Sequence, residues 1–136
     1  MKRREVQRDG NCLFHAATVA ASPEVFYNMV GDEEVRHAEQ LRADAVALMR
    51  RDEGKQFSAF LTGDFEEYLR DMLRSGTWGG EPELRAIAGV KQRPVHVYVE
   101  RVGGYVCVCE YADGTAAGGE AIRVLFDSKH YDALLA

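Results

Sequence analysis

The sequence predicts an α+β domain in which a small, largely antiparallel sheet is flanked by helices. Hydrophobic residues recur at helical spacing over the first two thirds of the chain. The last third changes to β-branched and aromatic runs separated by short turns. Helices followed by strands are typical of the α+β class. The 136 residues suit one domain, residues 1–136, with one core.

Three helices are expected before residue 76. The first is the Ala-rich segment 12–21, which follows the polar turn 7–11 and stops at Ser22-Pro23. The second starts at the acidic residues 32–34, near the positive end of the helix dipole, and should end at Gly54. The third follows Gly63-Asp64 and ends at Ser75-Gly76. Its apolar face consists of Phe65, Tyr68, Leu69, Met72 and Leu73.

A short helix and several strands are expected next. Segment 82–88 begins with Pro82 in its first turn and should end at Gly89. Runs 95–99 and 105–109 flank Gly103-Gly104, which predicts a hairpin. After a small-residue loop at 112–119, the chain continues as a strand at 122–126, a turn at 127–129 and a return segment at 130–134.

Composition and charge exclude several classes of protein. The chain is 46% hydrophobic and 29% charged, which is ordinary for a folded domain. Its net charge of −5 disfavours a nucleic-acid clamp, and no apolar run approaches the roughly 20 residues that span a bilayer. Basic residues 2–4 are expected to form a solvated end, and no apolar stretch follows them, so no secretory signal is expected. We expect a monomer in the cytoplasm, with the nucleus as the alternative.

The three cysteines indicate reduced thiols rather than a disulfide framework or a zinc site. Cys107 and Cys109 alternate with valines in a strand, so both should face the same side of the sheet. The sequence has no Cys-x-x-Cys, and the four histidines stand alone along the chain. No metal site is therefore predicted. The remaining cysteine is Cys12, and the histidines are His15, His37, His96 and His130.

Cys12 stands between the polar turn Asp9-Gly10-Asn11 and an apolar helix. A helix N-terminus favours a thiolate, so this position is expected to lower the pKa of the thiol. Free backbone N–H groups there could also receive an oxyanion during acyl transfer. The alternative is that Cys12 is a small buried hydrophobic residue that opens a core helix, and this segment alone favours that interpretation.

His130 is the best candidate for the base that a nucleophilic thiol requires. It follows a predicted strand and turn, and Asp132 lies two residues on, so both side chains would share one face of an extended segment. A carboxylate there would hold the imidazole and stabilise its charged form. The alternatives are a surface-loop histidine and a helix-capping aspartate.

Trp78-Gly79-Gly80 forms a predicted loop with two interpretations. Trp78 is either a core or lid residue beside a glycine turn, or one wall of a narrow cleft that admits only a slim, extended peptide.

Three segments in this order resemble the OTU (ovarian tumour) family of papain-like cysteine proteases, most of which are deubiquitinases. The first is Asp9-Gly10-Asn11-Cys12-Leu13-Phe14, where the family has Asp-Gly-x-Cys-Leu-Phe. The second is the run 78–88, which begins Trp-Gly-Gly, and the third is His130-Tyr131-Asp132. The resemblance extends from Asp9 to Asp132. His15 stands where the family often has Arg, and little sequence precedes Asp9.

The resemblance implies a papain-like fold and a Cys-His-Asp triad. By it, Cys12 is the nucleophile, His130 the general base and acid, and Asp132 the residue that orients His130. Asp9 would order the loop before Cys12, and the backbone N–H groups of Asp9, Gly10, Asn11 and Cys12 would form an oxyanion hole.

The implied reaction is hydrolysis of the isopeptide bond after the C-terminal glycine of ubiquitin, through an acyl-enzyme thioester and without a cofactor. Trp78, Gly79 and Gly80 would line the cleft for the ubiquitin tail. The partner is ubiquitin or polyubiquitin. Two alternatives remain open: a catalytically silent ubiquitin-binding module, or a protease that acts on a ubiquitin-like modifier or a polyprotein.

Overall fold

The computed structural model describes residues 1–52, 64–112 and 119–136. The described strands form one five-stranded sheet in the order β1-β5-β4-β2-β3. Only β2 and β4 are parallel neighbours, so the expectation of a largely antiparallel sheet is confirmed. The strands are β1 (Lys2–Arg4), β2 (Val95–Arg101), β3 (Gly104–Tyr111), β4 (Ile122–Asp127) and β5 (His130–Leu135). The predictions at Gly54, at Gly63 and over most of the 112–119 loop lie outside the described residues.

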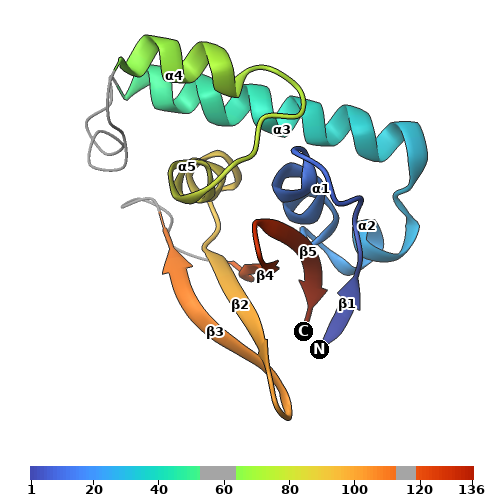
Figure 1. Ribbon diagram of the computed structural model, residues 1–136. Helices are drawn as coiled ribbons and strands as arrows, with labels where there is room; N and C mark the ends of the chain where they lie inside the picture. The colour runs from blue at the N-terminus through green and yellow to red at the C-terminus, as the bar shows by residue number, and fades with distance from the viewer. Residues whose placement is uncertain (53–63, 113–118) are drawn as a thin grey trace.

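The helices stack on the sheet, with α1 and α5 between the sheet and the long helix α3 (Figure 1). Helix α4 lies along α3 on the far side from the strands (Figure 1). Among the described residues, none of the helices is both long and apolar enough to cross a bilayer. The helices are α1 (Cys12–Val19), α2 (Pro23–Asn28), α3 (Gly31–Arg51), α4 (Phe65–Met72) and α5 (Glu81–Lys91).

The helices differ from expectation in two places. Helix α2 is an additional helix, in which Ser22 is an N-cap whose hydroxyl accepts the Val25 N–H at 3.2 Å, and Pro23 occupies the first turn. Helix α5 passes through Gly89 to Lys91 and ends where Gln92 adopts a left-handed conformation with φ of 54°. Gly89 therefore does not terminate the helix, because Gln92 supplies the turn that a glycine usually makes.

Helix α1 lies at the centre of the core. Every residue of α1 except His15 is buried, and three of the eight are alanine or valine residues with no exposed surface. Burial of a large apolar side chain such as Leu13 or Phe14 contributes roughly 1.5–3 kcal/mol to stability. This packing fixes the first residue of the helix, Cys12, against the sheet.

The basic N-terminus is structured, and the expectation of a solvated end is wrong. Strand β1 pairs with β5, which brings Lys2 opposite Leu135 and sets the two termini side by side (Figure 1). Arg4 donates to the Phe26 carbonyl at 2.8 Å and forms an ion pair with Glu34. The arginines of β1 therefore tie the start of the chain to the rest of the domain.

The predicted hairpin of β2 and β3 is confirmed, but it contains a bulge. Val97 pairs with Cys109, whereas the next residue of β2, Tyr98, pairs with Cys107, so Val108 is an extra residue in β3. An extra residue moves the following side chains to the other face. Cys107 and Cys109 consequently point to opposite faces of the sheet, contrary to the sequence expectation.

Candidate active site

The structure brings Cys12, from the front of the chain, against the turn that precedes β5. The Tyr131 N–H donates to Cys12 Sγ at 3.4 Å, and the thiol lies 3.9 Å from the Lys129 carbonyl oxygen. These two backbone groups flank His130. The turn is made by Ser128 and Lys129, which both have positive φ values of 48° and 75°. The sulfur and the chain on either side of His130 are therefore in direct contact.

The thiol environment differs from the one that the sequence suggests. Cys12 is only 1% exposed, and burial raises the pKa of its thiol. The N–H groups of Tyr131 and Leu13 oppose this effect, whereas the negative charges of Asp9 and Asp132 add to it. Burial outweighs the helix N-terminus, so the expectation of a lowered pKa is wrong for this state of the protein.

His130 and Asp132 are paired as the strand geometry predicts. Both side chains lie on one face of β5, and His130 Nε2 is 2.6 Å from Asp132 Oδ1. An ionised carboxylate can only accept, so Nε2 carries the proton and Nδ1 is the basic nitrogen of the neutral ring. Within the described part of the chain, His130 Nδ1 is buried and has no hydrogen-bond partner.

Asp132 is held by three groups although it is 1% exposed. The Val6 N–H donates to Oδ1 at 2.9 Å, and Arg3 donates to Oδ2 from Nε at 2.9 Å and from Nη2 at 2.7 Å. Burial alone would raise the pKa of this carboxyl group. The Val6 N–H, Arg3 and His130 together overcome that effect and lower the pKa. The carboxylate is therefore kept ionised beside the imidazole.

The loop before Cys12 is ordered largely by its own hydrogen bonds. Asp9 Oδ1 accepts the Asn11 N–H at 2.9 Å, the Asp9 carbonyl accepts the Cys12 N–H at 3.2 Å, and the Asp9 N–H donates to Gln7. Three of the four predicted oxyanion donors are thus used within the loop. The hydrogen bonds described for this loop leave the Gly10 N–H as the donor that can receive an oxyanion without first breaking a contact.

Arg42 on α3 supports this loop, and no pattern in the sequence indicates that role. The side chain is 4% exposed and donates to the carbonyls of Met72 at 2.8 Å, Thr77 at 2.9 Å and Gly10 at 3.1 Å, and to Asn11 Oδ1 at 2.8 Å. It also lies 4.3 Å from the centre of the Phe14 ring. In the sequence Arg42 resembles the other exposed arginines of α3, so only the tertiary contacts reveal it.

The Trp-Gly-Gly loop packs against Leu13, the residue that follows Cys12 in α1. A Cβ atom on Gly79 would come 2.8 Å from Leu13 Cδ2, so a larger residue at this position would displace the Leu13 side chain. Gly80 donates its N–H to Glu83 Oε1 at 2.7 Å, and Tyr68 donates to Glu83 Oε2 at 2.5 Å. Burial raises the pKa of Glu83, against these hydrogen bonds. Trp78 is 46% exposed and lines, with both glycines, an open cavity of about 410 Å³.

The lining of that cavity does not include Cys12 or His130. His15 also lies apart from the sulfur, because its Nδ1 is 2.6 Å from Glu34 Oε2 on α3. The structure thus brings together Cys12, His130, Asp132 and the Asp9 loop, and it places the Trp-Gly-Gly loop beside the same helix.

Comparison with known proteins agrees with this arrangement. The model of a family described as OTU-like cysteine protease matches residues 7–126, which is most of the chain. This chain belongs to the OTU-like cysteine protease family. The resemblance found in the three sequence segments is confirmed, and so is the fold class, because the helices and mixed sheet of this OTU domain match solved OTU domains.

Curated relatives of this OTU domain include two proteins of Arabidopsis thaliana. OVARIAN TUMOR DOMAIN-containing deubiquitinating enzyme 4 is 34% identical over 133 residues, which cover 93% of this chain and 41% of the relative. Deubiquitinating enzyme 2 of the same series is 29% identical over 132 residues, which cover 97% of this chain and 57% of the relative. The chain therefore spans only part of the length of these relatives.

Solved structures share the fold. The OTU domain of OTUD1 superposes with a TM-score of 0.70 at 25% identity, over 96% of this chain and 83% of that one. The Hazara virus OTU, solved bound to ubiquitin, has a TM-score of 0.72 at 21% identity, over 97% of this chain and 79% of that one.

Proposed function

We propose that this OTU domain is a thiol-dependent deubiquitinase that hydrolyses the isopeptide bond after the C-terminal glycine of ubiquitin. The observation that carries the proposal is the His130–Asp132 pair at 2.6 Å, with the Cys12 sulfur packed against the backbone on both sides of His130. The substrate class is suggested by the relatives, which are named deubiquitinating enzymes, and by the viral OTU domain solved with ubiquitin.

In the proposed mechanism His130 Nδ1 takes the thiol proton of Cys12. A buried ring nitrogen that has no partner among the described residues is costly, and a role in proton transfer accounts for it. Asp132 holds the Nε2 proton in place and stabilises the imidazolium that forms. Arg3 would act through Asp132, because it keeps the carboxylate ionised.

The thiolate then attacks the carbonyl carbon of the terminal glycine of ubiquitin, and the oxyanion is received at the Gly10 N–H. The imidazolium gives its proton to the amine of the leaving lysine as the carbon–nitrogen bond breaks, which leaves a thioester on Cys12. His130 next takes a proton from water, the hydroxide attacks the thioester, and the proton returns to the sulfur. Ubiquitin leaves with a free carboxylate, and no cofactor takes part.

Access to the sulfur is a separate requirement. Because Cys12 is 1% exposed, the ubiquitin tail must displace the atoms above the thiol before attack can occur. The Trp78–Gly80 loop is the proposed wall of the cleft, since two glycines leave room for a slim peptide ending in Gly-Gly. The burial of the Cys12 sulfur is also the observation that favours the second candidate, a catalytically silent ubiquitin-binding module.

The deciding experiment uses ubiquitin that carries a thiol-reactive group at its C-terminus, with adduct formation measured by mass spectrometry. The wild-type domain should form a one-to-one adduct, and Cys12→Ala should form none. Cys109→Ala, which removes an exposed cysteine from β3, is the matched control and should react like the wild type.

Each failure has a distinct meaning. A folded wild-type domain that binds ubiquitin without forming an adduct would support the silent binding module. An adduct formed only with probes built on ubiquitin-like modifiers would identify a protease for those modifiers. An adduct that persists in Cys12→Ala would disprove the assignment of the nucleophile.

A further inference from the structure

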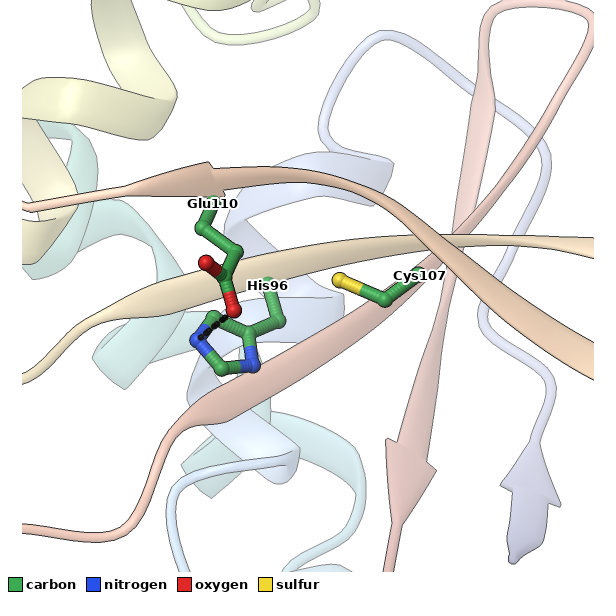
Figure 2. A group of neighbouring side chains, drawn as sticks. All are labelled: His96, Cys107 and Glu110. Carbon is green, nitrogen blue, oxygen red and sulfur yellow. Dashed lines mark ion pairs between the residues drawn. The ribbon is translucent and has the colours of Figure 1, made fainter.

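Three potential metal ligands converge on the sheet face at the β2–β3 hairpin. His96 lies on β2, and Cys107 and Glu110 lie on β3, with their side chains directed toward one another (Figure 2). One donor atom of each residue lies within 4.8 Å of the other two, and His96 Nε2 is 3.3 Å from Glu110 Oε1. None of the three belongs to the proposed catalytic site, because strand β4 separates β2 from β5 and His130.

The bulge in β3 creates this convergence. In a regular strand, residues three apart such as Cys107 and Glu110 point to opposite faces. The extra residue Val108 restores both to the face of His96, because Glu110 pairs with His96 and Cys107 pairs with Tyr98. Bulges often redirect side chains at functional positions. The spacing of the three ligands in the sequence does not indicate a metal site, since they come from two strands.

The donor chemistry selects the class of ion. A thiolate and an imidazole are ligands of zinc and of similar divalent transition metals rather than of magnesium or calcium. Two ligand atoms about 2.1 Å from a tetrahedral ion lie about 3.4 Å apart, which is close to the His96–Glu110 separation. The Cys107 sulfur, which lies within 4.8 Å of the other two donor atoms, would supply the third ligand, and water would fill the fourth position.

Charge balance also fits a divalent cation. A thiolate, a carboxylate and a neutral imidazole carry two negative charges together. Arg123 on β4 pairs with His96 across the parallel strands and brings a positive charge to the same face, but its guanidinium contacts Glu120 at 2.8 Å. Without an ion Cys107 is a neutral thiol, because burial raises its pKa, and its deprotonation on metal binding would add the second negative charge to that of Glu110.

We propose that His96, Cys107 and Glu110 form a zinc-binding site that joins the edge strand β3 to β2. Binding breaks the thiol S–H bond and the hydrogen bond from Cys107 Sγ to the Cys109 carbonyl, forms a zinc–sulfur bond, and releases the proton to solvent. The ion would stabilise the hairpin, which among the described strands pairs with the rest of the sheet through β2.

The test is calorimetric titration of the domain with zinc chloride in the Cys12→Ala background, where the catalytic thiol cannot bind the metal. One equivalent should bind, and Cys107→Ala or His96→Ala should weaken binding by at least about a hundredfold, since even outer-shell partners of metal ligands contribute 10- to 100-fold. Cys109→Ala, two residues away on the opposite face, is the matched control and should bind like the parent.

A second readout identifies the sulfur ligand. Cobalt(II) bound at the site should show a thiolate-to-metal charge-transfer band that disappears in Cys107→Ala and remains in Cys109→Ala. These ligands are on the sheet surface or near it, and circular dichroism will verify that each variant is folded. Absence of zinc binding, or binding that is unchanged in folded Cys107→Ala, would overturn the proposal.

Discussion

Replacement of Arg42 by methionine should destabilise the domain more than any surface substitution on the same helix. The guanidinium donates to four oxygen acceptors, three of them backbone carbonyls from the loop before Cys12, the end of α4 and the approach to the Trp-Gly-Gly loop. Methionine retains much of the packing volume but donates no hydrogen bond, so all four acceptors lose this partner.

The expected cost follows from the number and kind of these bonds. A hydrogen bond to a charged group contributes roughly 1.5–3 kcal/mol, but desolvation of the buried guanidinium cancels part of the total. Each buried acceptor that is left unsatisfied costs about 1–3 kcal/mol, and several acceptors are affected, so we expect a total loss of about 3–5 kcal/mol. The melting temperature should fall by roughly 10–20 °C. Arg42→Lys should lie in between, because an ammonium has three donors for four acceptors.

The assay is urea unfolding followed by circular dichroism, with Arg50→Met as the matched control. Arg50 lies on the same helix and contacts Glu66 at 2.8 Å, but both side chains are about half exposed, so its loss should change stability by less than about 0.5 kcal/mol. A loss below about 1 kcal/mol for Arg42→Met, or equal effects for the two variants, would refute the inferred role of Arg42.

Three further predictions follow from the same region. Gly10→Ala should cost about 1–3 kcal/mol or more, because its Cβ would lie 1.6 Å from a backbone carbonyl oxygen; Gly80→Ala has open space and serves as the control in thermal unfolding. Asp132 has a lowered pKa in the folded state, so its contribution to stability is present above about pH 4 and is lost as pH falls through the folded-state value. Arg3→Met should therefore lower stability at neutral pH and flatten the acid dependence in urea titrations, and an unchanged profile would contradict the pairing. Burial raises the pKa of Cys12, and the prediction concerns its alkylation by iodoacetamide in a variant that lacks Cys107 and Cys109. The alkylation rate should continue to increase with pH up to pH 9.0. A rate that reaches its plateau below about pH 7 would disprove the raised pKa.

Local patterns in the sequence were sufficient for much of the fold. Helical spacing, cap residues and turn residues act over a few positions, so α1, α3, α4 and the β2–β3 hairpin could be recognised directly. The same reasoning placed His130 and Asp132 on one face of a strand, because residues two apart in an extended chain share a face. Ser22-Pro23 both ends α1 and begins the short helix α2, and the local pattern does not distinguish a helix end from the cap of a following helix.

Contacts between distant segments could not be predicted in this way. Arg3 reaches Asp132 only because β1 pairs with β5, and Arg42 reaches the loop before Cys12 only because α3 packs over α1. The bulge at Val108 likewise arises from pairing between two strands, and it reversed the expected orientation of one cysteine.

The sequence by itself determined the helices other than α2, the hairpin, the order of the three family segments and the proximity of His130 to Asp132, since each depends on spacing within a short stretch. Only the tertiary structure decided how deeply Cys12 is buried, which groups hold Asp132 ionised, and which strand residues meet across the hairpin. Burial and electrostatic environment depend on every element packed around a group, and no local pattern of residues specifies that sum.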